Sequence, residues 1–212
     1  MLSINLIQRH FQANHLDSLL DALSANGLEL PLPLRIRLGQ ANASAVAMAL
    51  RRVIELTYGP TGLSRELTAH LLKDQQPDGS YSQDPLATAA VVSAFGRLLM
   101  EQPGTAGEPV HAAYDRALAA LASMQGEDGL FRSPTLGVDR TRQERALCSA
   151  FILFLLAEDQ DFRHAVRFAD LLNWFEQNQD DLEADTNRLW LMARTDTSSR
   201  PRPSSNLAAI AA

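Results

Sequence analysis

Hydrophobic residues recur along most of this chain at steps of three and four, the spacing that places them on one face of an α-helix. Two kinds of helical segment alternate. In residues 110–124 the apolar side chains form a single stripe, which indicates a helix with one face in solvent. Residues 146–156 are apolar on nearly every side, so the helix they form must be enclosed by other helices.

This alternation of outer and inner helices occurs four times. Outer helices are expected at about residues 4–23, 64–74, 110–124 and 162–177, and inner helices at about 43–50, 86–95, 146–156 and 189–192. An isolated hairpin cannot bury its apolar helix, whereas stacked hairpins can. We therefore predict an all-α fold, a double-layered open arc of about four helical hairpins. The units cover about residues 4–57, 61–101, 108–157 and 160–193.

Residues 194–212 form a tail that is rich in Ser, Pro and Arg and has a small apolar end at 207–212. Such a composition does not pack a core. Two interpretations stay open: the apolar end docks into a groove, or it frays.

A short motif lies at the turn between the outer and inner helices of the two middle units. It reads Gln, three residues, Gly, one residue and an aromatic, at 75–81 and again at 125–131, with Gly79 and Gly129 fifty residues apart. Glycine permits a positive φ just after a helix, and Asp78 and Asp128 can cap nearby amides. We therefore assign the motif to stability and not to catalysis.

With these residues the chain resembles the QW-type repeat of the α/α-toroid families, the squalene-type terpenoid cyclases and the protein prenyltransferase β-subunits. Matching positions are Arg116, Ala117, Leu121, Gln125, Gly129 and Phe131 in the third unit, and Leu71, Gln75, Gly79 and Tyr81 in the second. Departures are Ala120 and His70 at the aromatic place, Glu66 at the basic place and Phe131 in place of Trp. The resemblance implies toroids that close with about six hairpins. Four hairpins should give an open arc or one that closes by dimerisation.

Composition narrows the possible partners and locations. A net charge of −6 argues against nucleic acid, and no apolar run reaches the ~20 residues of a membrane span. The first ten residues lack the features of a secretory signal. Cys148 is the sole cysteine, so no intrachain disulfide forms and we expect a cytoplasmic location.

The catalytic motifs of the families that the chain resembles are missing. There is no Asp-x-Asp-Asp string to protonate an alkene, and Cys148 follows Ala146 where a zinc-binding pattern would have Asp two residues earlier. Catalytic residues are therefore unknown, and no cofactor is predicted. A weak alternative is magnesium at Asp180, Asp181 and Asp185, although the spacing is one residue too long. Acidic residues there also suit a helix N-terminus.

A cluster of arginines lies near the start of the third inner helix, at Arg132, Arg140, Arg142 and Arg145. The free amides and dipole of a helix N-terminus favour anions, so this cluster is a candidate site for phosphate or diphosphate. The alternative is a set of ordinary surface pairs with Glu127, Asp128 and Glu144.

The leading prediction is a non-catalytic interaction or hydrophobic-ligand-binding module that uses the concave face of the inner helices. Small residues there would leave room for a ligand: Thr88, Ser93, Ala94, Cys148 and Ser149. The expected partner is a second copy, another protein or a hydrophobic, prenyl-type small molecule. The competing prediction is an isoprenoid-type enzyme, either prenyltransferase-like or terpenoid cyclase-like, that acts alone or as one component of a shared active site.

Overall fold

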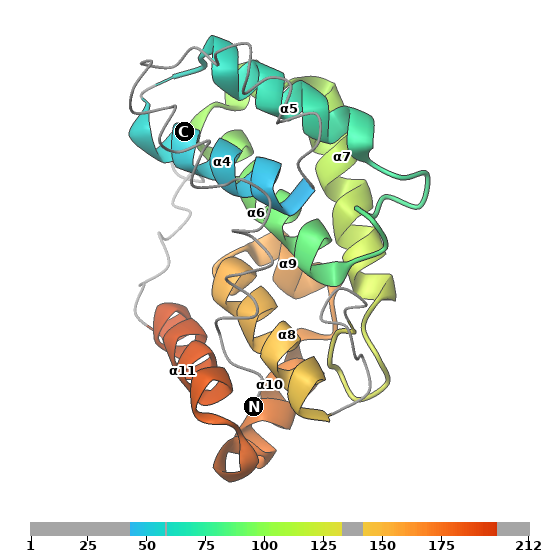
Figure 1. Cartoon of the computed structure of the whole chain (residues 1–212), viewed down its shortest axis with the longest axis vertical. Coiled ribbons are helices and arrows are strands. Elements are labelled where there is room, and N and C mark those ends of the chain that lie inside the picture. The colour runs from blue at the N-terminus through green and yellow to red at the C-terminus, as the bar shows by residue number, and fades with distance from the viewer. Residues whose placement is uncertain (1–42, 58, 133–141, 199–212) are drawn as a thin grey trace, which may run out of the picture.

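The computed structural model describes residues 43–57, 59–132 and 142–198 (Figure 1). Regular secondary structure in these residues is helical. The elements are α4 (Ala43–Leu56), α5 (Gly62–Asp74), α6 (Pro85–Glu101), α7 (Pro103–Ser123), α8 (Arg142–Leu156), α9 (Gln160–Ala165), α10 (Phe168–Gln177), the 3-10 helix η2 (Gln179–Asp181) and α11 (Ala184–Ser198). The predicted all-α class is thus confirmed for this part of the chain. The outer helix expected at 4–23 and most of the tail, residues 199–212, lie outside the described residues.

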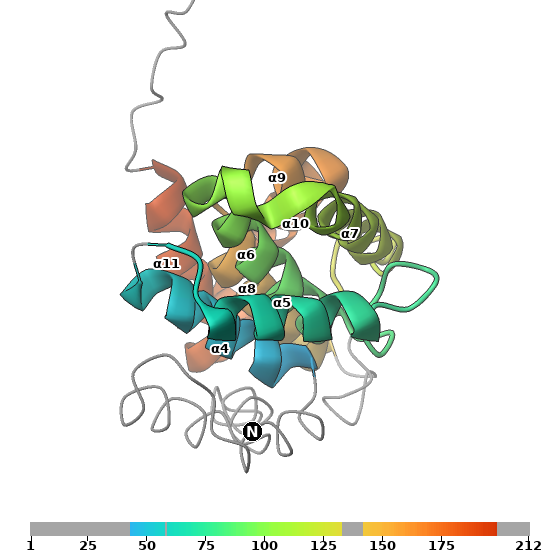
Figure 2. The ribbon, with the colours of Figure 1, turned by 90° about the horizontal axis from the view of Figure 1, so that it is seen from above.

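The helices pack in two series. Helices α4, α6, α8 and α11 contact one another in that order, while α5 contacts α7 and α7 contacts α9. Helix α5 also packs against α4, and α7 packs along α6. Figures 1 and 2 show α6 and α8 near the middle of the molecule, with α7 along one side. Outer and inner helices therefore alternate along the described chain.

Helix α6 illustrates why an inner helix forms and where it lies. The Asp84 side chain caps the helix by accepting the Leu86 amide at 3.0 Å, and Pro85 occupies the first turn, where no amide partner is needed. Every residue from Pro85 to Val92 is buried. Its two charged residues, Arg97 and Glu101, both lie near the end of the helix. The apolar surface of its first half can thus be enclosed on all sides.

Large aromatic side chains fill the space between the two series. Each is almost fully inaccessible: Tyr81, Phe95, Phe131, Phe162, Phe175 and Trp190. Phe175 of α10 stacks on Trp190 of α11 with ring centroids 5.1 Å apart, which joins the last outer helix to the last inner one. Burial of each such side chain contributes about 1.5–3 kcal/mol to the free energy of unfolding. These six side chains therefore contribute much of the energy that holds the outer and inner helices together.

Two outer helices differ from the predicted ones. The single helix expected at 162–177 is interrupted, because Val166 (φ −101°, ψ 166°) and Arg167 (φ −75°, ψ 67°) leave helical geometry between α9 and α10. Helix α7 begins earlier than expected but is kinked at Gly107, which has φ 65° and ψ 164°. Its regular part therefore follows Gly107, close to the predicted start at residue 110. Among the described residues, no helix has both the length and the apolar character of a membrane span.

Candidate functional site

The first Gln–Gly turn is bound to the outer helix of the following unit. The Gln75 side-chain amide donates to the carbonyl of Gly79 at 3.1 Å, within the turn, and to that of Ala113 at 2.7 Å, on α7. Its carbonyl oxygen accepts two hydrogen bonds from the Arg116 guanidinium, at 2.6 and 3.1 Å. One glutamine therefore closes its own turn and holds the next helix.

The second turn repeats this arrangement with a different partner. Gln125 donates to the Gly129 carbonyl at 2.6 Å, and its side-chain oxygen accepts the backbone amide of Arg167 at 2.8 Å. The Arg167 guanidinium donates to the Gly126 carbonyl in the same turn. The break between α9 and α10 exposes the Arg167 amide for this bond. Sequence reasoning did not identify Arg167, although it follows Arg116 by 51 residues, close to the repeat period.

Both turns approach their neighbours too closely for a side chain at the glycine. Gly79 and Gly129 have φ of 87° and 82°, as the motif predicts. A Cβ at Gly79 would lie 2.3 Å from the Arg116 carbonyl oxygen, and one at Gly129 would lie 3.0 Å from the backbone of Asp170. These contacts support a structural role for the motif.

Four of the five residues predicted to line a ligand-binding wall are buried: Thr88, Ala94, Cys148 and Ser149. The Thr88 hydroxyl accepts the Tyr81 amide at 3.1 Å, and the Ser149 hydroxyl accepts the Phe131 amide at 2.8 Å. The aromatic residue of each motif enters the interior with its backbone amide, which needs an acceptor there. The two hydroxyls therefore join turn to inner helix, and Ser93 alone of the five is partly exposed.

Ser93 lies in a row of polar contacts across three inner helices. Arg51 of α4 donates to the Ser93 hydroxyl of α6 at 3.0 Å, and that hydroxyl donates to the Leu155 carbonyl of α8 at 3.5 Å. Next to Leu155, Phe154 is exposed, and its ring lies 6.2 Å from that of Phe151. Helix α8 thus contributes both to the polar row and to the exposed apolar side chains.

Exposed large hydrophobic side chains in the described residues belong only to inner helices. They are Leu56 on α4, Met100 on α6, Phe154 on α8, and Leu191 and Met192 on α11. All five lie at or beyond the middle of their helices. We call the exposed parts of the inner helices marked by these five residues the inner-helix surface. Its charges along α4 and α6 are paired within each helix, as between Arg97 and Glu101 at 2.7 Å.

The opposite ends of α6 and α8 border a depression of about 810 Å³. Its lining includes Gln83, just before α6, together with Arg132 and Arg145 from the predicted arginine cluster. The Arg145 guanidinium pairs with the Asp128 carboxylate at 2.5 Å. Burial by itself would raise the pKa of the Asp128 carboxyl, but hydrogen bonds from Arg145 and from the Leu130 amide outweigh it and hold this pKa below its ordinary value.

The other two predicted anion-binding arginines do not join this depression in the described structure. Arg142 lies over the Trp174 ring, 5.2 Å from its centroid, and donates to the Asn178 side chain. Arg140 falls outside the described residues. The structure therefore unites Arg132 with Arg145 and separates Arg142 from them. The pair between Arg145 and Asp128 is one of the surface pairs anticipated as the alternative.

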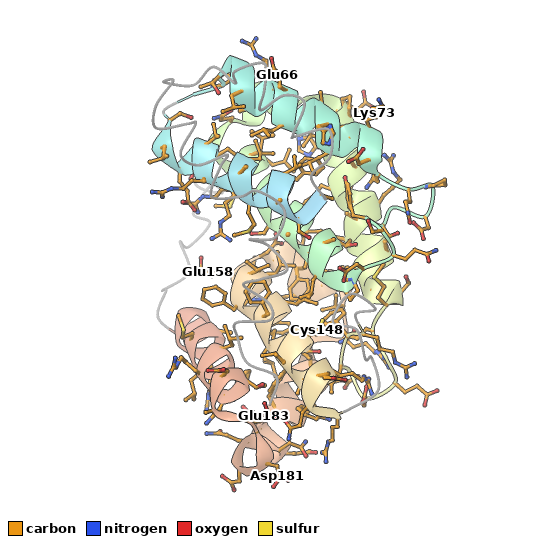
Figure 3. All side chains as sticks on the ribbon, viewed as in Figure 1. Glu66, Lys73, Cys148, Glu158, Asp181 and Glu183 are labelled. Carbon is orange, nitrogen blue, oxygen red and sulfur yellow. The ribbon has the colours of Figure 1, made fainter. Side chains whose placement is uncertain are left out.

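The acidic residues proposed for magnesium lie at one end of the molecule. Asp180 and Asp181 form part of η2, and Asp185 lies in the first turn of α11. Figure 3 shows Asp181 and Glu183 at this end, away from Cys148 in α8. The Asp181 carbonyl accepts the Gln143 side chain at 2.8 Å. Within the described residues, no group of three or more His, Cys, Asp and Glu side chains is placed to hold a metal ion.

Comparison with known proteins yields no match: no family model, no curated protein and no solved structure is significantly similar to this chain. The resemblance to QW-type repeats therefore stays a prediction from the sequence. A functional assignment has to rest on the geometry of the described residues.

Proposed function

We propose that this chain is a non-catalytic interaction module, built as an α/α-toroid-like open arc, whose inner-helix surface binds an apolar partner or a hydrophobic ligand. The observation that carries the proposal is the distribution of exposed apolar side chains. Among the described residues, the five large exposed ones all lie on inner helices, the elements that stacking should enclose.

Covering these exposed apolar side chains with a partner would be energetically favourable. Covering a large apolar side chain contributes about 1.5–3 kcal/mol when it passes from full exposure to full burial, and proportionately less for a partly exposed one. Apolar side chains scattered singly over a surface need no explanation, whereas a contiguous apolar patch indicates a binding surface. The five side chains lie at or beyond the middle of inner helices that contact one another in series, and we propose that they form one such patch.

The polar row across α4, α6 and α8 supports a surface that is formed before binding. The bonds from Arg51 to Ser93 and from Ser93 to Leu155 fix the spacing of three helices. A preformed surface loses less conformational entropy when it binds, so more of the apolar contact energy appears as affinity.

An isoprenoid-type enzyme is the second candidate, and the depression that contains Arg132 and Arg145 is the observation in its favour. Two arginines beside a helix N-terminus are suited to a diphosphate. Because Asp128 already pairs with Arg145, a diphosphate would have to displace that carboxylate. We therefore rank this function below the interaction module.

The test is a binding titration on the full chain, at protein concentrations at which sedimentation shows a monomer, with a solvatochromic apolar dye and with a panel of prenyl diphosphates, each with and without magnesium. We expect saturable binding without turnover, weakened at least about fivefold by Phe154→Asp because a carboxylate replaces an apolar contact. Ala119→Asp provides a matched control, since Ala119 is exposed on the outer helix α7.

Three outcomes decide between the functions. Dye binding that is equal in wild type, Phe154→Asp and Ala119→Asp would refute the inner-helix surface as the binding site. Turnover of a prenyl diphosphate that Arg132→Ala and Arg145→Ala abolish would establish the enzyme instead. Binding that is lost only in Phe154→Asp supports the module.

A further inference from the structure

We infer that the partner that covers the inner-helix surface is a second copy of this chain, packed through a two-fold axis. The inference rests on the proposed function, because it names the occupant of the same surface. Two observations carry it: the amount of exposed apolar area and the internal pairing of the charges beside it.

The exposed apolar area matches what a homodimer interface requires. Leu56, Met100, Phe154, Leu191 and Met192 are 56%, 75%, 37%, 41% and 45% exposed. If a fully exposed large side chain presents about 200 Å², these five together offer on the order of 500 Å². A standard interface buries about 800 Å² on each partner, and homodimer interfaces are about 65% apolar, which again gives roughly 500 Å².

The charges beside these side chains suit a copy of the same surface. Arg51 and Arg52 both pair with Glu55, at 3.3 and 3.2 Å, and Arg97 pairs with Glu101. A two-fold axis places one patch against the same patch on the partner. An uncompensated charge would repel its own copy there, and a strong net field would select an oppositely charged protein instead. Pairing within each helix reduces both effects, because it leaves α6 neutral and α4 with a single excess positive charge.

Helix α11 adds further apolar side chains to the inner-helix surface. It contacts α8, and one side of it carries Ala184, Asn187, Arg188, Leu191 and Met192 around a shallow, open depression. Leu191 and Met192 are two large apolar residues that are exposed there, as expected where a subunit packs.

The experiment is sedimentation equilibrium of the full 212-residue chain over a range of concentrations. We expect a dimer. We also expect Met100→Asp and Leu191→Asp each to raise its dissociation constant roughly tenfold or more, as for a central contact of an interface. Met100 is 75% exposed, so its replacement should leave the subunit folded. Circular dichroism verifies this, and Ala119→Asp again provides the matched control.

A monomer at every concentration would overturn the inference, and so would a dimer whose dissociation constant neither variant changes. These failures are distinguishable from failure of the proposed function. If the chain is a monomer and Phe154→Asp still weakens dye binding, the proposed binding module stands, and the occupant of the surface is something other than a second copy. If the chain is a monomer and Phe154→Asp leaves dye binding unchanged, both the proposed function and the dimer are refuted.

Discussion

At the scale of single residues, the repeated turn depends on a glycine that no larger residue can replace and on a glutamine that bonds at both ends of its amide. Gly79 combines a positive φ with a backbone contact to Arg116, and Gln75 uses both ends of its amide. A hydrogen bond typically contributes about 0.5–1.5 kcal/mol, more with a charged donor such as Arg116. The glycine contributes by permitting the approach that makes those bonds possible.

We predict that Gly79→Ala lowers the free energy of unfolding by about 2–4 kcal/mol, because the added methyl group meets a backbone carbonyl and the residue keeps a positive φ. Gly129→Ala should cost less, since its Cβ would lie 3.0 Å from its neighbour and not 2.3 Å. Gly62→Ala, with nothing within 4 Å, should change stability by less than about 0.5 kcal/mol or raise it. Urea denaturation measures all three, and equal costs would contradict this account of the turn.

At the scale of elements, the joint between a turn and its inner helix depends on one hydroxyl. Thr88 follows Tyr81 by seven residues and Ser149 follows Phe131 by eighteen, yet both accept the buried amide of the motif's aromatic residue. The difference in spacing reflects the larger number of residues between the motif and the inner helix in the third unit. A small polar residue inside an apolar helix is therefore explained by the amide it satisfies.

Replacing Thr88 with Val keeps the shape of the side chain but removes the acceptor, which leaves the Tyr81 amide unsatisfied. We expect a loss of about 1–3 kcal/mol, and a similar loss for Ser149→Ala. Ser93→Ala should cost less than about 1 kcal/mol because Ser93 is partly exposed. Urea denaturation gives the energies, and faster hydrogen exchange at the Tyr81 amide identifies the broken bond. Unchanged exchange at that amide would contradict the assignment.

Sequence periodicity predicts where the described helices lie, apart from the break between α9 and α10, because it reports which side of each segment is apolar. The glycine conformations follow in the same way, since φ preferences are local. What the pattern could not show is which distant group a side chain meets. Arg167 lies beside the break between α9 and α10, and its amide bonds Gln125, 42 residues earlier. For the same reason the pattern does not show that Thr88 and Ser149, which it predicts to leave room for a ligand, accept buried amides.

At the scale of the whole molecule, the two glutamines couple successive units. Gln75 joins the second unit to the third, and Gln125 joins the third to the fourth. In repeat proteins stability is approximately the sum of unit and neighbour terms, so cooperative unfolding depends on such contacts. The chain has two tryptophans, Trp174 and Trp190, and both lie in the fourth unit.

We predict that Gln125→Leu separates two transitions that coincide in the wild-type chain. Tryptophan fluorescence, which reports the fourth unit, should change at lower urea than far-UV circular dichroism, which reports every helix. Gln177→Leu is the matched control, because Gln177 holds the corresponding place in the fourth unit and bonds no following helix in the described residues. Coincident transitions in the Gln125 variant would show that apolar packing alone couples the units.

The direction of these glutamine contacts has a consequence for how such a chain lengthens or shortens. Each turn is completed by residues of the outer segment that comes after it, Ala113 and Arg116 for Gln75 and Arg167 for Gln125. An added unit therefore keeps these contacts only where it carries both a turn and the residues that hold the preceding turn, as a duplication of residues 116–166 does. A duplication whose seam falls between Gln125 and Gly129 would separate the glutamine from the carbonyl that it binds.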